Sequence, residues 1–173
     1  MIIGDDILKQ FNIEKESQSK PVEKKKYDKP SQYKKDGEKI LESKGYADMA
    51  ENVIYDKEKK ELRFFNLTTS KLRKLLAMSS GIYNYVLNQD ECDKDELLSK
   101  IIYFKMKCIY ECGRECKDKQ DFNKFMKFAK IVKALEYIID NKDTIDIREE
   151  YILFNRYMES LIAYHKYHGG REQ

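Results

Sequence analysis

No proline follows Pro30 in this chain, and Pro21 is the only other one. Proline removes a backbone donor and interrupts helices, so its absence leaves most of the chain free to be helical. Glycine is also scarce, while Lys, Glu, Leu and Ile are common. No alternation of apolar and polar residues typical of strands continues past residue 67. These features predict an all-α fold, a compact bundle of about five helices.

The segment over residues 145–167 is expected to be the central helix of that bundle. When the sequence is stepped at the helical repeat from Tyr151, apolar side chains cover about half of the circumference. A surface helix needs a narrower stripe, so other helices should pack around this one. Gly169 and Gly170 then predict where the helix stops. The polar half of the circumference is expected to hold Arg148, Asn155, Arg156, Glu159 and Ser160.

Four further helices are predicted from apolar residues at helical spacing, over residues 37–56, 69–89, 94–113 and 119–141. The core stripes of the last two should include Ile109 and Phe128, respectively. Thr68 or Thr69 is a natural N-cap for the 69–89 helix. The run over residues 56–61 is expected to be a charged connector. Among the apolar residues that follow it, Phe64, Phe65 and Leu67 should dock against the bundle.

The first part of the chain has a different composition. Residues 1–36 are dominated by Lys, Glu, Asp, Ser and Gln and hold both prolines. Such a segment cannot bury enough apolar surface to offset the entropy of ordering. The sequence therefore predicts a flexible charged N-terminal extension over residues 1–36 and a helical bundle domain over residues 37–173.

The overall charge and hydropathy exclude several classes of protein. The net charge is only +3, so no global field demands nucleic acid, and any such binding must rest on local patches. No run of about 18 apolar residues exists, so no membrane span and no membrane partner are expected. The first residues lack a secretory signal, which favours a cytoplasmic location. In that reducing compartment the four cysteines should be thiols.

The residues that most often bind metals or catalyse reactions form no active-site pattern here. Cys108, Cys112 and Cys116 are spaced by four, whereas structural zinc usually needs two residues between paired cysteines, so packed thiols are favoured. His165 falls on the apolar arc of the last helix, which indicates a packed histidine rather than a ligand or base. We find no nucleophile context and no glycine-rich phosphate loop. The chain is therefore expected to be no enzyme and to hold no catalytic residue, metal or cofactor.

The sharpest surface feature is a polar stripe on the 94–113 helix. Tyr103, Lys107, Tyr110 and Arg114 recur there at i, i+4, i+7 and i+11. Cations meet phosphates and tyrosine rings stack on bases, so RNA contact is one interpretation. The other interpretation is a solvated polar face with two half-buried tyrosines. Lys105 falls inside the apolar stripe, where its stem would pack while its ammonium group reaches an edge.

Three segments, in order, resemble a known family. They are NLTTSKLR over residues 66–73, IYFKMKCIYECGRE over residues 102–115 and RYMESLIAYHKYHGG over residues 156–170. Together they are similar to the small subunit of type III-A CRISPR effector complexes, the Csm small subunit. YADMAE over residues 46–51 resembles the start of that family's first helix. The likeness covers residues 46–170 at similar spacing.

The resemblance implies a small, helical, non-catalytic subunit. In that family several copies stack head to tail beside the filament of backbone subunits that holds the guide RNA, in a complex that also contains a large subunit. A basic face lines the groove that receives the target RNA, and target cleavage belongs to the backbone subunit. The implied partners are thus target RNA, guide RNA, other copies of the chain, and the backbone and large subunits. The alternative is a purely structural adaptor without direct RNA contact.

The family's basic positions carry over to seven residues of this chain. Lys74 is basic here too, although that position varies in the family, and Tyr103 joins them from the stripe. The predicted RNA-binding residues are Lys71, Arg73, Lys74, Tyr103, Lys105, Lys107, Arg114, Arg156 and Lys166. Contacts of this kind fix position along a backbone rather than read sequence.

Overall fold

The computed structural model of the chain describes residues 41, 45–64, 66–89, 92–114 and 121–172. The predicted extension over residues 1–36, Phe65 and Cys116 lie outside these residues. The described elements are α2 (Tyr46–Ile54), β1 (Tyr55–Asp56), β2 (Glu61–Leu62), α3 (Thr69–Asn88), α4 (Lys94–Gly113), α5 (Asp121–Phe128), α6 (Ile131–Asp140) and α7 (Ile147–Tyr167). The predicted all-α class is confirmed, with six helices and one two-stranded hairpin in this part of the chain.

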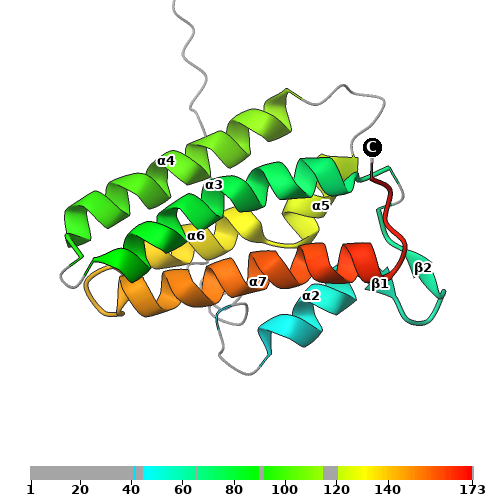
Figure 1. The fold of residues 1–173 in the computed structure, drawn as a ribbon, viewed down its shortest axis with the longest axis horizontal. Helices are drawn as coiled ribbons and strands as arrows, with labels where there is room; N and C mark the ends of the chain where they lie inside the picture. The colour runs from blue at the N-terminus through cyan, green and yellow to red at the C-terminus, as the bar shows by residue number, and fades with distance from the viewer. Residues whose placement is uncertain (1–40, 42–44, 65, 90–91, 115–120, 173) are drawn as a thin grey trace, which may run out of the picture.

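Helix α7 is the centre of the arrangement, as predicted. It packs against α2, α3 and α6, while α4 lies across α3 and α6 on the far side of the core (Figure 1). The helices α3, α4, α6 and α7 therefore form a four-helix bundle, with α2 added on the outer side of α7 and the short α5 beside α4 and α6.

Large side chains of α7 fill the core, and their polar atoms are satisfied there. Tyr151 and Tyr157 are fully buried, and burial raises the pKa of both phenols. The Tyr157 hydroxyl donates to the carbonyl of Ala129 at 2.9 Å, and the Tyr151 hydroxyl donates to the carbonyl of Ser79 at 3.1 Å. A buried hydroxyl without a partner would cost free energy, so these bonds fix α3 and the turn before α6 against α7.

Asn155 belongs to the polar half of the predicted central helix, yet it is a core residue. Asn155 is fully buried between α7 and α3, where its Oδ1 accepts a hydrogen bond from the Ser79 hydroxyl at 2.8 Å. Its Nδ2 donates to Glu159 at 2.9 Å. An amide is tolerated in the core because each of its polar atoms has a partner.

The predicted helix over residues 119–141 is two helices. The break falls at Lys130, which adopts a left-handed conformation with φ 53° between α5 and α6. The turn changes which residues face the core. Phe128, expected in the core, is 51% exposed and lies under the guanidinium of Arg63, whose Cζ is 5.4 Å from the ring centroid. Ile109 of α4, also expected in the core, is 51% exposed as well.

Among the described residues, the first predicted helix is shorter than residues 37–56. The predicted charged connector over residues 56–61 is part of a β-hairpin. Helix α2 ends at Ile54, and Tyr55 is already extended. The connector then forms an antiparallel hairpin in which Tyr55 pairs with Leu62 and Asp56 with Glu61. Asp56 ties the hairpin to the chain that follows, because its Oδ2 accepts from Arg63 Nη1 at 2.8 Å.

The start of α3 and the end of α7 match their sequence signals. The Thr68 side chain caps α3 by accepting from the backbone of Lys71 at 3.3 Å. At the end of α7, Gly169 has φ 80°, and the backbone N–H groups of Gly169 and Gly170 donate to Lys166 and His165, respectively. This is the Schellman arrangement, and it turns the chain back toward α3. None of the helices in the described residues combines the length and the apolar composition that crossing a membrane requires.

Two glycines give a matched test of this fold. A Cβ at Gly81, inside α3, would have no heavy atom within 4 Å, whereas a Cβ at Gly170 would overlap the ring of His165. Gly81→Ala should therefore raise the free energy of unfolding by about 0.5–1 kcal/mol, because glycine weakens a helix interior. Gly170→Ala should lower it by about 1–3 kcal/mol through overpacking.

Urea denaturation of the two variants and of the unmodified chain measures both changes. An unchanged midpoint for Gly170→Ala would show that the turn after α7 does not hold His165 as described.

Candidate nucleic-acid interface

The structure divides the nine predicted RNA-binding residues among several places. Four of them, Lys74, Tyr103, Lys107 and Arg114, lie where α3 and α4 meet. Arg73 and Lys166 lie together where the start of α3 meets the end of α7, and Arg156 is exposed on α7. The remaining two lie apart from these groups. Lys71 is over the Phe122 ring of α5, and Lys105 pairs with Glu136 of α6.

We use the name α3–α4 seam for the facing residues Lys74, Met78, Gly81 and Tyr85 of α3 and Glu96, Lys100, Tyr103, Lys107 and Glu111 of α4, together with Arg114, which directly follows α4 and pairs with Glu111. The two helices are antiparallel, because Lys74 near the start of α3 meets Glu111 near the end of α4. These positions recur at three- and four-residue intervals on each helix, so they form one continuous edge.

Polar contacts close both ends of the α3–α4 seam. At one end the Lys74 ammonium donates to Glu111 Oε1 at 2.9 Å, and Arg114 Nη2 lies 3.2 Å from Glu111 Oε2. The hydrogen bond from Lys74 and the charge of Arg114 hold the pKa of the Glu111 carboxyl below its usual value. At the other end the Tyr85 hydroxyl donates to Glu96 Oε2 at 2.8 Å.

Lys107 lies between these two ends, and its charge also helps to lower the pKa of the Glu111 carboxyl one turn away. The Lys107 ammonium group is 5.1 Å from the centroid of the Tyr103 ring, and among the described residues no carboxylate forms an ion pair with it. Tyr103 itself is 61% exposed. The cation–π contact contributes about 0.5–1 kcal/mol at such a site, so an incoming anion can displace it cheaply.

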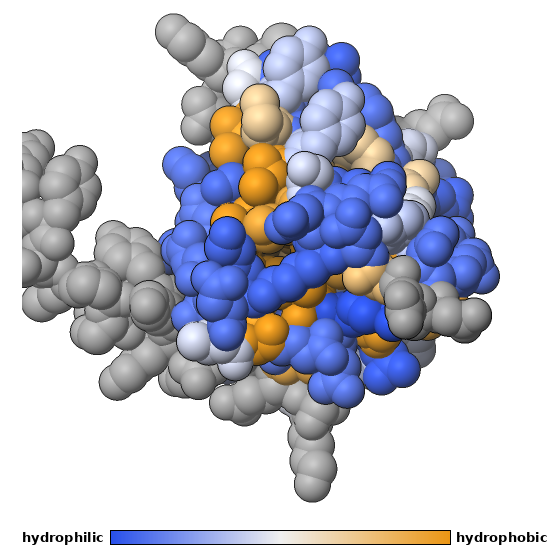
Figure 2. All heavy atoms as spheres, turned by 90° about the vertical axis from the view of Figure 1, so that its left-hand side faces the viewer, coloured by the Kyte–Doolittle hydropathy of each residue, from blue (hydrophilic) through white to orange (hydrophobic). Residues whose placement is uncertain are grey.

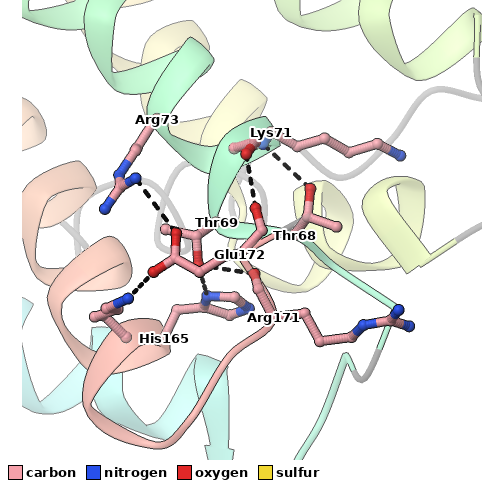
Figure 3. Close-up of polar contacts among 9 residues, drawn as sticks. Thr68, Thr69, Lys71, Arg73, His165, Arg171 and Glu172 are labelled. Carbon is pink, nitrogen blue, oxygen red and sulfur yellow. Dashed lines mark hydrogen bonds and ion pairs between the residues drawn. The ribbon is translucent and has the colours of Figure 1, made fainter.

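An acidic residue already occupies the other cation pair, as Figure 3 shows. After the turn at Gly169 the chain runs back along α3, and its Glu172 carboxylate accepts from Arg73 at 3.4 Å and forms an ion pair with Lys166. Thr69 holds this segment, since its backbone N–H and hydroxyl both donate to the Arg171 carbonyl, at 2.7 and 2.9 Å. Arg73 and Lys166 thus converge on one anion.

The histidines confirm the packed interpretation for His165. Its Nε2 donates to the carbonyl of Leu67 at 3.1 Å, and its Nδ1 lies 3.2 Å from the Thr69 hydroxyl. Burial lowers the pKa of this imidazole. His168 stacks on Tyr55 with ring centroids 3.9 Å apart. Both rings therefore pack the end of α7 against earlier segments, His165 against the start of α3 and His168 against β1.

The cysteines behave as packed thiols in the part of the chain that is described. Cys108 is buried, and burial raises the pKa of its thiol to about 12. Cys112 is half-buried. No group of three or more His, Cys, Asp or Glu side chains among the described residues is placed to hold a metal ion.

Sequence reasoning missed the acidic partners of the predicted cations. Glu111 stands three residues before Arg114, a spacing that pairs side chains on a helix, so this contact had a local signal. Glu136 and Glu172 meet Lys105 and Arg73 only through the tertiary fold. The seam residue Lys100 was missed as well, although its pairing with Glu96 follows the i, i+4 rule.

Comparison with known proteins decides the family. The family model described as Csm2 Type III-A matches residues 48–171. The chain belongs to the Csm2 family of type III-A CRISPR systems. All nine predicted RNA-binding residues lie within the part that matches the Csm2 model, whereas Glu172 lies just beyond it.

Individual Csm2 proteins agree with this assignment. The "CRISPR system Cms protein Csm2" of Streptococcus thermophilus is 37% identical over 133 residues, which span 77% of this chain and 98% of that protein. The protein of the same description from Mycobacterium tuberculosis is 34% identical over 110 residues, or 60% of this chain and 76% of that protein. The one from Enterococcus italicus is 32% identical over 112 residues, or 64% and 74%.

The acidic partners generate a prediction about anion binding in general. Replacing Glu111 and Glu172 together by Gln should free the cations that they contact and strengthen binding to a polyanion. The double variant should elute from a heparin column at higher salt than Glu58→Gln with Glu61→Gln, which changes the net charge equally on the exposed hairpin. Charges screened beyond about 10 Å at 0.1 M salt matter less than those in direct contact. Equal elution of the two variants would show that Glu111 and Glu172 do not mask the cations.

Proposed function

We propose that this Csm2-family chain is a non-catalytic subunit of a cytoplasmic type III-A CRISPR ribonucleoprotein and that it contacts the guide and target RNA. The α3–α4 seam and the pair of Arg73 and Lys166 would be the contact points. The observation that carries the proposal is the exposed Lys107–Tyr103 pair, which lies on α4 next to the end of the seam where Lys74 and Arg114 both meet Glu111.

The energetics favour RNA over the internal partners of these cations. The ion pair of Arg73 with Glu172 joins two exposed side chains, and such pairs contribute about 0–1 kcal/mol. In the pair of Lys74 with Glu111 the lysine is exposed, whereas the Glu111 side chain is half-buried. A phosphate backbone offers a row of anions and releases condensed counterions when cations replace them. Cations that are weakly held within the protein are therefore available to an RNA strand lying along the seam.

The spacing of the cations suits backbone contact rather than sequence reading. Lys74, Lys107 and Arg114 are spread along an edge, and lysine and arginine side chains are long enough to follow a flexible strand. Contacts to phosphates position an RNA without selecting its bases. That property suits a subunit of a complex in which the guide RNA selects the target by base pairing.

The non-catalytic role is supported by the engagement of the buried histidine. His165 is 1% exposed and both ring nitrogens face protein atoms, so it is unavailable as a general base. The resemblance to Csm small subunits points the same way. It also supports the remaining partners that we propose, namely further copies of this chain and the backbone and large subunits.

A structural adaptor without RNA contact is the second candidate. One observation favours it, because α4 also exposes apolar side chains. Ile102, Met106 and Ile109 are exposed on α4, and apolar side chains reach the surface over this helix in the upper part of the face shown in Figure 2. Exposed apolar patches of this kind mark protein contacts. In an adaptor, the cations of the seam would pair with carboxylates of neighbouring subunits.

A filter-binding salt titration separates the two candidates. An RNA-binding chain should lose affinity with a log–log slope of about −0.7 for each phosphate contacted. Lys107→Glu with Arg114→Glu should weaken target RNA binding at least tenfold and flatten the slope, while circular dichroism keeps its helical signal. The matched control is Lys59→Glu with Lys127→Glu, two exposed lysines outside the predicted set.

Unmeasurable binding by the unmodified chain at low salt would favour the adaptor. Equal loss of binding in the control would show that net charge, rather than the α3–α4 seam, attracts RNA.

A further inference from the structure

A groove opens in the middle of the α3–α4 seam, between its two closed ends. Its volume is about 480 Å³, which is within the range of pockets that bind small ligands. Its apolar lining comes from both helices, and its polar lining includes a phenol, two ammonium groups and the Glu96 carboxylate. Met78, Gly81, Ile82 and Phe104 line the groove together with Tyr103 and Lys107.

Gly81 is the reason that the groove is open on its α3 side. It lies within α3, has no positive φ, and would meet no heavy atom within 4 Å if it carried a Cβ. Neither backbone strain nor a close helix contact therefore explains a glycine at this position, where alanine would favour the helix. The glycine leaves open space on this side of α3, in the groove that Met78 and Ile82 also line.

The polar lining has the chemistry of a nucleotide site. Tyr103 offers an exposed aromatic ring, and Lys107 lies 5.1 Å from the centroid of that ring. Aromatic rings stack on unpaired bases, and a neighbouring ammonium group contacts the phosphate of the same nucleotide. An unpaired base also has two apolar faces, which suit the apolar lining made by Met78 and Phe104.

The charges in the lining favour a nucleotide over an acidic or apolar protein side chain alone. Lys100 is held at the end of the groove by Glu96, at 3.1 Å, so its charge is offset. Lys107 has no such partner among the described residues and stands directly beside the opening. An occupant that places a flat apolar group inside and an anion at Lys107 uses both features.

We propose that this groove receives one unpaired RNA base, with the Tyr103 ring stacked on it and Lys107 contacting the adjacent phosphate. The inference rests on the proposed function and goes beyond it, since it assigns a base-binding site to a surface otherwise expected to contact phosphates only. The recognition is by shape and stacking, so any base is accepted.

Fluorescence anisotropy with two single-stranded RNAs of equal length tests this site. One RNA consists of uridines, and in the other the central nucleotides lack the base. The unmodified chain should bind the uridine RNA about fivefold or more tightly, the lower end of what stacking of a base on an aromatic side chain provides. The salt dependence should be the same for both RNAs, because their phosphates are the same.

Two variants should remove the preference without removing the cations. Gly81→Leu adds a side chain on the α3 side of the groove, where a Cβ would meet no heavy atom within 4 Å, and Tyr103→Leu removes the ring. In each variant the ratio of the two dissociation constants should fall to about one while the salt slope is kept. Asn84→Leu is the matched control, since it adds the same side chain to an exposed position of α3 that does not line the groove.

Three other results would each contradict a part of this proposal or of the proposed function. An equal affinity of the unmodified chain for both RNAs, or an unchanged preference in Gly81→Leu, contradicts the base site while leaving phosphate contact intact. If Gly81→Leu keeps the preference but loses co-purification with other CRISPR subunits, the groove holds a protein side chain instead. If Lys107→Glu with Arg114→Glu affects neither RNA, the proposed function itself fails.

Discussion

The burial of α7 on three sides is the constraint on which the rest of the structure depends. Its apolar and aromatic residues face α2, α3 and α6, and hydrogen bonds fix the neighbours in register. Asn155 bonds to Ser79 of α3, the Tyr157 hydroxyl bonds to the carbonyl of Ala129 at the α5–α6 break, and Arg148 donates to the carbonyl of Val86 at 2.8 Å. Buried polar bonds of this kind contribute little net energy but are costly to break, so they specify one arrangement.

Because α7 fixes α3, it also fixes the surface that α3 shares with its two neighbours. One side of α3 meets α4 in the α3–α4 seam, and its first turn meets the chain that returns after α7. In both places exposed cations meet carboxylates, and the pair of Arg73 with Glu172, in which both side chains are exposed, contributes little to stability. The fold therefore does not need these cations for its stability. A surface that binds an exchangeable anion requires such cations.

The helices could be predicted from the sequence where one apolar face persists over several turns. The 94–113 prediction matches α4 in both bounds, and Thr68 marks the start of α3 correctly. The failures have tertiary causes. No local sequence pattern shows that Lys130 adopts a left-handed conformation. None shows that the Ser79 hydroxyl donates to Asn155 in the core. The candidate site was similar: helical spacing brought Tyr103, Lys107 and Arg114 to one edge of α4, but it could not place Glu172 against Arg73 or reveal the groove beside Gly81.

Photo-cross-linking tests the central claim, RNA contact through the α3–α4 seam, most directly. Target RNA carrying 4-thiouridine would be irradiated in the assembled effector, and the cross-linked peptides of this chain would be identified by mass spectrometry. We expect cross-links within α4, centred on Tyr103 and Lys107, and at the start of α3. Cross-links confined to α2 and the hairpin, or none on this chain while the backbone subunits are labelled, would contradict it.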